Sequence, residues 1–219
     1  MRSAAETWGE LSAPWQAAFD EAWDSWCAGC FGIGAVAVDD DGTIVARGRN
    51  RVLEQKSTPG VLADSFTAHA EMNVLAALPW RSTHGLHLYT TLEPCLMCAS
   101  AIVMLQIGTV HFAAADEMFA GMNEVLESHD FVASRAPERR GPVDGHLPGQ
   151  LERFARVLPL SFLAFWMGEQ ADSIRVARAQ DPSLADLALT LAHDGRLVAV
   201  RDGNGTTADA LAAVWDDLV

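Results

Sequence analysis

The sequence predicts an α/β domain of three layers, with helices packed on a central sheet. From residue 8 to residue 114 the apolar patterns follow the order helix, two strands, helix, strand, helix, strand. Such alternation is typical of helices that cover a sheet. The chain has 219 residues, enough for one full domain or for a catalytic domain with a substantial extension, and enough to bury a sizeable core.

The first expected elements are a helix and a hairpin. Apolar and aromatic side chains follow one another at steps of three and four from Trp8 to Trp26, which places them on one helical face. This pattern is more typical of a core helix than of an aromatic binding platform. The segments IGAVAV (33–38), DDDG (39–42) and TIVARGRN (43–50) then predict two strands joined by a turn.

The next elements carry the residues of chemical interest. After Thr67, AHAEMNVLAAL predicts a helix that ends before Pro79. HLYTTL (87–92) and TVHFAA (109–114) are rich in strand-forming residues, and CLMCASAIVML (95–105) between them has helical spacing.

The remainder of the chain predicts a loop and further helices. The segment 134–150 is rich in proline, glycine and charge, as loops and boundaries are. LERFARVLPLSFLAFWM and TTADALAAVWDDLV beyond it predict helices, the second capped by Thr206 or Thr207, with a short strand at GRLVAVRDG between them. We expect four regions: an N-terminal helix packing on the core (1–29), the core (30–130), a loop (131–150) and a mainly helical extension (151–219).

Composition and charge restrict the classes of function. The net charge of −14, from 15 basic and 29 acidic residues, disfavours nucleic-acid substrates, because tight binding to phosphates uses many Lys and Arg side chains. No apolar run reaches the roughly 18 residues of a membrane span, and the N-terminus lacks a signal-peptide pattern. We therefore expect a cytoplasmic protein without membrane association.

Cys95 and Cys98 lie one helical turn apart, and His69 is a candidate third ligand for a metal bound by them. Four cysteines are too few for a disulfide framework in a chain of this length, which favours thiol chemistry or metal binding. One His and two Cys form a complete ligand set for a catalytic zinc, which keeps a fourth position open. Glu71, two residues after His69, need not bind the metal and can face that open position as a proton carrier. The arrangement predicts a hydrolytic centre.

These residues carry a family resemblance. His69-Ala70-Glu71 followed by Pro94-Cys95-Leu96-Met97-Cys98 matches the zinc deaminase signature, H-x-E and then P-C-x-x-C. The sequence resembles the cytidine deaminase-like superfamily of CMP/dCMP type, in particular the branch of tRNA adenosine, guanine and bacterial nucleoside deaminases. The resemblance covers residues 30 to 116 in the order GIGAVAVDDDG, GRN, TAHAEMNVLAAL, LYTTLEPCLMCASAI, IGTVHFAA.

The resemblance implies a fold, a cofactor and roles for individual residues. The fold is the three-layer α/β/α fold of that superfamily with a central mixed sheet. One Zn²⁺ per chain is held by His69, Cys95 and Cys98, and Glu71 is the catalytic proton shuttle. Asn50 and the backbone amide of Ala70 contact the substrate base. The reaction is hydrolytic loss of ammonia from an exocyclic amine.

Departures from the tRNA enzymes favour a small substrate. Those enzymes have a basic residue before Ile-Gly, where this chain has Gln106-Ile107-Gly108, and a basic C-terminal helix, where this chain is acidic. We expect a free nucleobase, nucleoside or related amino-heterocycle, as in purine or pyrimidine salvage, and a homodimer, which is common in such enzymes. Met72 and Asn73 are similar to deoxycytidylate deaminases and TLEPC to the base and tRNA branch, so the sequence does not choose between purine and pyrimidine.

Several alternatives stay open at this point. One is a tRNA adenosine deaminase with the same chemistry, and another is a non-catalytic zinc protein of the same fold. Cys27 and Cys30 are expected as buried free thiols, with a structural metal or disulfide as the alternative. Phe66 and Trp80 flank the helix that begins at His69 and are candidates either for the core or for stacking on a base.

Overall fold

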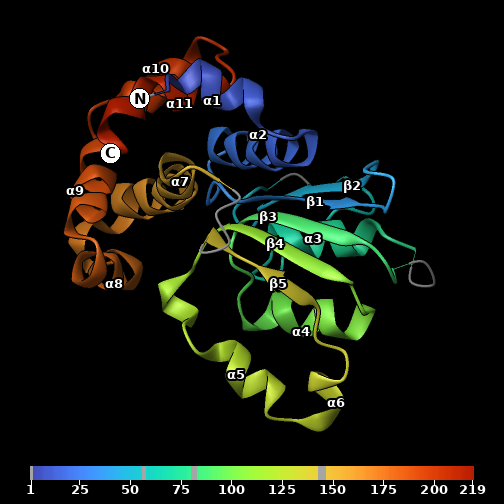
Figure 1. Cartoon of the computed structure of the whole chain (residues 1–219). Helices are drawn as coiled ribbons and strands as arrows, with labels where there is room; N and C mark the ends of the chain where they lie inside the picture. The colour runs from blue at the N-terminus through green and yellow to red at the C-terminus, as the bar shows by residue number, and fades with distance from the viewer. Residues whose placement is uncertain (1, 56–57, 80–82, 143–146) are drawn as a thin grey trace.

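A computed structural model describes residues 2–55, 58–79, 83–142 and 147–219, and in it a five-stranded mixed sheet lies between helices (Figure 1). The strand order is β2-β1-β3-β4-β5. β1 is antiparallel to β2 and to β3, whereas β3, β4 and β5 run parallel. The bounds are β1 Gly34–Val38, β2 Ile44–Arg49, β3 His87–Leu92, β4 Thr109–Ala114 and β5 Glu138–Arg140. The predicted three-layer fold, the mixed sheet and the hairpin are confirmed.

The two faces of the sheet are covered by different helices. α2 (Ala13–Cys27) and α7 (Gly149–Met167) cover one face, and α3 (Ala70–Ala77) and α4 (Leu96–Leu105) cover the other (Figure 1). Strand side chains alternate accordingly: Val36 belongs to the core of the first face and Ala35 to the core of the second. Because β1 is buried on both faces, its sequence is apolar throughout.

Two glycines let helices approach the sheet closely. A Cβ added at Gly34 would lie 2.2 Å from the Ala18 carbonyl oxygen of α2, and one at Gly48 would lie 2.6 Å from the Ala70 carbonyl oxygen of α3. Only residues without a side chain permit these contacts. The second contact fixes the start of α3, where His69 lies, against the end of β2.

The rest of the chain is mainly helical. The bounds are α1 Ala4–Glu10, η1 Glu117–Phe119, α5 Met122–Glu127, α6 Asp130–Ala133, η3 Gly168–Gln170, α8 Asp172–Gln180, α9 Pro182–Leu191, α10 Arg196–Asp202, α11 Thr207–Val214 and η4 Trp215–Asp217. α5 and α6 lie below α4, whereas α10 and α11 lie with α1 above α2, and α7 to α9 lie to the left of α2 (Figure 1). The two predicted C-terminal helices and the cap by Thr206 are confirmed.

Two helices replace the single N-terminal helix that the aromatic spacing predicts. Leu11 and Ser12 are extended, with ψ near 140° and 152°, and end α1. Pro14 then lies in the first turn of α2, where proline is favoured because its missing N–H has no intrahelical partner to lose. The periodicity continued across the break, so spacing alone did not reveal it.

Two further predictions were wrong. GRLVAVRDG forms the helix α10 instead of a strand: Leu197 and Val200, three residues apart, face the same core, while Val198 between them is 38% exposed. The predicted loop 131–150 contains the end of α6, the strand β5 and the start of α7, and residues 143–146 of it lie outside the described part. β5 is three residues of charged sequence, so it lacks the apolar alternation that predicts a strand.

None of the helices in the described ranges combines the length and the apolarity that a bilayer crossing needs.

Candidate metal centre and active site

The starts of α3 and α4 bring the three predicted metal ligands together. His69 is the N-cap of α3, Cys95 is the N-cap of α4, and Cys98 lies in the first turn of α4. The Nδ1 atom of His69 lies 3.6 Å from the Cys95 sulfur and 3.5 Å from the Cys98 sulfur. The two sulfurs are 3.7 Å apart. These residues form the one group of this kind found in the described residues that could hold a metal ion.

The spacing of the three ligand atoms fits zinc. Tetrahedral zinc with bonds of about 2.3 Å to sulfur and about 2.05 Å to nitrogen separates two sulfurs by about 3.8 Å, and sulfur from nitrogen by about 3.6 Å. The observed separations of 3.7, 3.6 and 3.5 Å agree with that geometry. Two thiols and an imidazole also form a ligand set that zinc prefers. The His69, Cys95 and Cys98 group can therefore hold a zinc ion.

The two thiols have unequal acidities. Hydrogen bonds with Cys98 and His69 lower the pKa of Cys95 to about 4. The hydrogen bond to Cys95, together with burial, raises the pKa of Cys98 above its usual value. Burial alone would lower the pKa of His69, but the hydrogen bond with Cys95 and the charge of Glu71 raise it overall. A bound cation would offset the clustering of negative charge on two buried thiolates.

Glu71 lies beside the ligands without joining them. It is 3% exposed, and burial raises the pKa of its carboxyl group. Oε2 lies 3.6 Å from the Cys98 sulfur, and Oε1 accepts a hydrogen bond of 3.3 Å from the Thr90 hydroxyl group. Thr90 therefore orients the carboxyl group from β3 and leaves its other oxygen directed towards the metal ligands.

Asn50 and Ala70 occupy the ends of two neighbouring elements. Asn50 follows β2 and is 2% exposed, and its Oδ1 accepts a hydrogen bond from the Val52 N–H at 3.2 Å. That bond fixes the amide and leaves Nδ2 as the group that can donate to a ligand. Ala70 is the first residue of α3, so its N–H has no acceptor within the helix.

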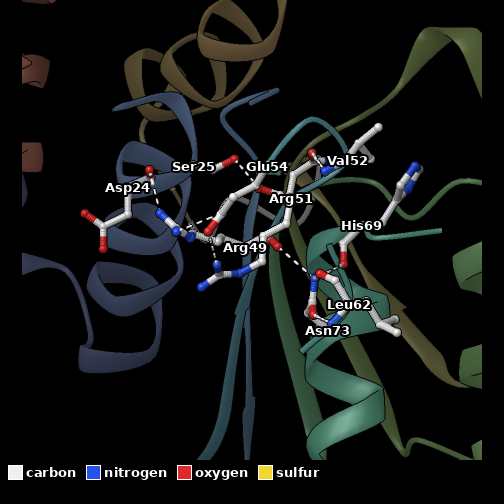
Figure 2. Close-up of polar contacts among 10 residues, drawn as sticks. Asp24, Ser25, Arg49, Arg51, Val52, Glu54, Leu62, His69 and Asn73 are labelled. Atoms are coloured by element: carbon white, nitrogen blue, oxygen red, sulfur yellow. Dashed lines mark hydrogen bonds and ion pairs between the residues drawn. The ribbon is translucent and has the colours of Figure 1, made fainter. Parts of the chain in front are cut away.

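Asn73, one turn after His69, joins the metal-binding helix to its surroundings (Figure 2). Its side-chain amide donates to the carbonyl oxygens of Arg49, Leu62 and His69 at 3.2, 3.1 and 3.3 Å, and its Oδ1 accepts from the Leu62 N–H at 2.8 Å. The sequence alone does not predict this role for Asn73, because its partners Arg49 and Leu62 are brought to it by tertiary packing.

The strand β2 and the loop after it are tied together by ion pairs (Figure 2). Arg49 donates to the Asp24 carbonyl oxygen at 2.8 Å and pairs with Glu54 at 2.9 Å, and Arg51 pairs with the same carboxylate at 2.5 Å. Ser25 donates to the Asn50 carbonyl oxygen at 2.8 Å. These contacts hold Asn50 in place from the side of α2.

Glu93 fixes the segment that leads from β3 to Cys95. Its carboxylate pairs with Arg139 of β5 at 2.5 Å, and accepts hydrogen bonds from the Asn123 side chain at 3.2 Å and the Asp116 N–H at 3.1 Å. The sequence does not reveal this network, because Asn123 lies beyond the last predicted strand and Arg139 lies in the segment predicted to be a loop.

Cys27, Cys30 and Phe66 lie in different environments. Cys27 is partly buried, Cys30 is fully buried and both are free thiols, so neither a disulfide nor a metal group involves them in the described chain. Burial raises the pKa of Cys27 to about 11. Phe66 is not in the core, being 79% exposed, and Trp80 lies outside the described residues.

Comparison with known proteins finds relatives for the part of the chain that carries the site. Residues 10–114 match the family model for the cytidine and deoxycytidylate deaminase zinc-binding region. The chain is 35% identical over 102 residues to a tRNA-specific adenosine deaminase of Aquifex aeolicus, covering 45% of this chain and 62% of that protein. It is 44% identical over 90 residues to the Bacillus subtilis tRNA-specific adenosine deaminase, covering 38% and 49%. The match therefore spans about half to two thirds of these relatives.

A solved structure shares the fold. The guanine deaminase from Nitrosomonas europaea is 17% identical, with a TM-score of 0.50, over 70% of this chain and 86% of that chain. The His-Cys-Cys group lies within the region that matches the zinc-binding family model, so the geometry of the site and the family match agree. The part of the chain that holds the site, residues 10–114, is similar to the cytidine and deoxycytidylate deaminase zinc-binding family and to tRNA-specific adenosine deaminases.

Proposed function

We propose that this protein is a zinc-dependent hydrolytic deaminase that releases ammonia from the exocyclic amine of a small nucleobase, nucleoside or related amino-heterocycle. The observation that carries the proposal is the buried Glu71 carboxyl group beside three zinc-compatible ligand atoms. A zinc site that serves only structure normally has four protein ligands, whereas three ligands leave a position for chemistry.

The zinc ligands and Glu71 are expected to have different roles in the reaction. Bound zinc supplies Lewis acidity, which lets water ionise near neutral pH. Glu71 accepts a proton from the water and delivers it to the leaving amine, so that a C–O bond forms, the C–N bond breaks and ammonia departs. The raised pKa of its buried carboxyl group suits both steps, because proton carriers work best with a pKa near the working pH.

Asn50 and Ala70 are placed to orient the heterocycle. The Asn50 Nδ2 group and the Ala70 N–H are donors at the ends of β2 and the start of α3, and each suits a ring nitrogen or carbonyl oxygen of the base. Thr90 keeps the Glu71 carboxyl group in one orientation while the ring binds.

The charge distribution favours a small substrate. Most arginines of the described chain pair with a neighbouring carboxylate, which leaves few cations for phosphates: Arg2, Arg49, Arg51, Arg139, Arg140, Arg153, Arg156, Arg175, Arg178, Arg196 and Arg201. The net charge of −14 acts in the same direction, because it repels a polynucleotide.

The first test is ammonia release from cytosine, adenine and guanine, each as base, nucleoside and nucleotide. Glu71→Gln is expected to keep one zinc per chain and to lower kcat by about 10²- to 10⁴-fold, because it removes the proton carrier. Cys95→Ala is expected to lose both zinc and activity. Full zinc in Cys95→Ala, measured by metal analysis, would refute the ligand assignment, and full activity in Glu71→Gln would refute the role of Glu71.

A second candidate is a tRNA adenosine deaminase. It is favoured by the relatives, since the Aquifex aeolicus and Bacillus subtilis proteins are both named tRNA-specific adenosine deaminases. Inosine formation in a tRNA transcript, with affinity that falls steeply as salt rises, would support this candidate over the small substrate. Ammonia from a free base or nucleoside, with no product in tRNA, would support the first. A homodimer and a cytoplasmic location stay predictions.

A further inference from the structure

Phe66 is the most exposed large apolar side chain in the described part of the protein, at 79%. It lies three residues before His69, and the centroid of its ring is 5.9 Å from the centroid of the His69 imidazole, with the two planes inclined at 55°. An aromatic ring that contacts a metal ligand and remains open to solvent is available to a ligand that enters the site.

The backbone around Phe66 is ordered by local hydrogen bonds. The Ser65 and Thr67 hydroxyl groups are 3.0 Å apart, and the Ala68 N–H donates to the Ser65 carbonyl oxygen at 2.9 Å. The His69 N–H donates to the Thr67 carbonyl oxygen at 2.9 Å. Phe66 is therefore presented by an ordered turn.

The same turn is tied to both substrate-binding elements. Asn73 binds both backbone groups of Leu62, and the Arg51 N–H donates to the Ala68 carbonyl oxygen at 2.8 Å. Arg51 directly follows Asn50. The turn that carries Phe66 is thus joined by a backbone hydrogen bond to the residue after Asn50, whose amide is expected to hold the substrate.

We propose that Phe66 is a specificity-determining residue whose ring stacks on the planar heterocycle of the substrate. The inference rests on the proposed deaminase function. It identifies Phe66 as the side chain that contacts the π-face of the substrate ring. Aromatic stacking selects for flat, polarisable rings whatever their hydrogen-bonding edge, whereas Asn50 and Ala70 read that edge. The substrate class that follows is a planar amino-heterocycle, bound between the Phe66 ring and the metal centre.

The experiment measures binding and turnover separately. Binding of the bases and nucleosides of the panel, and of a tRNA transcript, is measured by calorimetry on zinc-loaded Glu71→Gln protein, where no product forms. Adding Phe66→Ala is expected to weaken binding about tenfold or more, because base stacking on an aromatic residue is worth roughly that factor. In the protein with Glu71 intact, KM rises by a similar factor while kcat changes less than about threefold.

Two further variants make the result specific. Phe66→Trp is expected to retain binding because it keeps an aromatic face. Phe165→Ala removes another exposed phenylalanine, 58% exposed on α7, and is expected to leave binding unchanged. Zinc content should be equal in all of them.

The outcomes distinguish this inference from the proposed function. Equal affinity and KM in Phe66→Ala and the parent protein would overturn the stacking role and leave the deaminase intact. Binding that depends on Phe66 without any turnover would overturn the deaminase and support the stacking role. Failure of every ring in the panel to bind would overturn the stacking role directly.

Discussion

Asp116 lies just after β4, where the Met118 N–H donates to its side chain and Glu93 and Glu117 are neighbours. Burial raises the pKa of its carboxyl group to about 6. In the unfolded chain the group ionises near pH 3.8. The ionised form is therefore disfavoured in the folded state, and stability from this group is lost as pH rises from about 4 to about 6.

Asp116→Asn should raise the free energy of unfolding at pH 7 to 8 by about 1 to 3 kcal/mol, because one pKa unit is worth about 1.4 kcal/mol and the group is partly exposed. The amide can still accept from the Met118 N–H. The gain should shrink as pH falls through 6 and vanish near pH 4. Urea denaturation of zinc-loaded protein across this pH range measures it. A gain that does not change with pH would contradict the explanation, and Asp41→Asn, an exposed carboxylate, serves as the control.

Residue identities and short spacings were sufficient to predict that His69, Cys95 and Cys98 lie together, with Glu71 beside them. Their positions depend only on where α3 and α4 begin, and helix starts are local features of sequence. Asn73, Glu93 and Thr90 could not be given their roles in this way. Each acts on a residue that is brought to it by tertiary packing, such as Leu62, Arg139 or Glu71.

At the scale of elements, the close approach of α2 to β1 depends on Gly34. A methyl group there would overlap the backbone of α2, which cannot rotate away as a side chain can. Gly34→Ala should therefore lower the free energy of unfolding by about 2 to 3 kcal/mol.

Gly9→Ala provides a matched control for Gly34→Ala. Gly9 lies within α1 with no atom within 4 Å of an added Cβ. The same substitution there should raise stability by about 0.5 to 1 kcal/mol, because alanine favours helix more than glycine does. Chemical denaturation of the two variants checks the pair. Similar effects of both would show that the contact of α2 with β1 is not as close as described.

The elements that the sequence predicted correctly are those with long apolar patterns. The strands β1 to β4 and the helices α3, α4 and α7 each bury a face in one of two cores. The apolar periodicity of their sequences therefore predicts them. β5 and α10 are short and charged, and each is stabilised by the element next to it rather than by its own pattern. The break between α1 and α2 is signalled only by Ser12 and Pro14.

At the scale of the molecule, the helical extension and the sheet share one core. A single cluster of buried side chains includes residues of α2, β1 and β4 together with residues of α7, α8, α9, α10 and α11. Elements that share a core tend to unfold together. We expect the extension and the zinc site to be lost in one transition.

Urea titration with two signals tests this cooperativity. Release of zinc to a coloured chelator and loss of helical circular dichroism should have the same midpoint, since about half of the helical residues lie in the extension and the zinc is expected to be held by α3 and α4. Loss of helical signal at a lower urea concentration than zinc release would instead show that the extension unfolds by itself.

Residues near the C-terminus form hydrogen bonds with α2. The Trp23 indole N–H donates to the Gly205 carbonyl oxygen at 3.0 Å, across a separation of 182 residues, and Thr207 donates to Asp20 at 2.5 Å. Protein synthesis adds about 5 to 20 residues per second, so roughly 10 to 40 s pass between the appearance of Trp23 and that of its partner. During this interval the aromatic face of α2 emerges from the ribosome without its final cover, and the nascent chain depends on chaperones or on rapid pairing with the sheet to avoid aggregation.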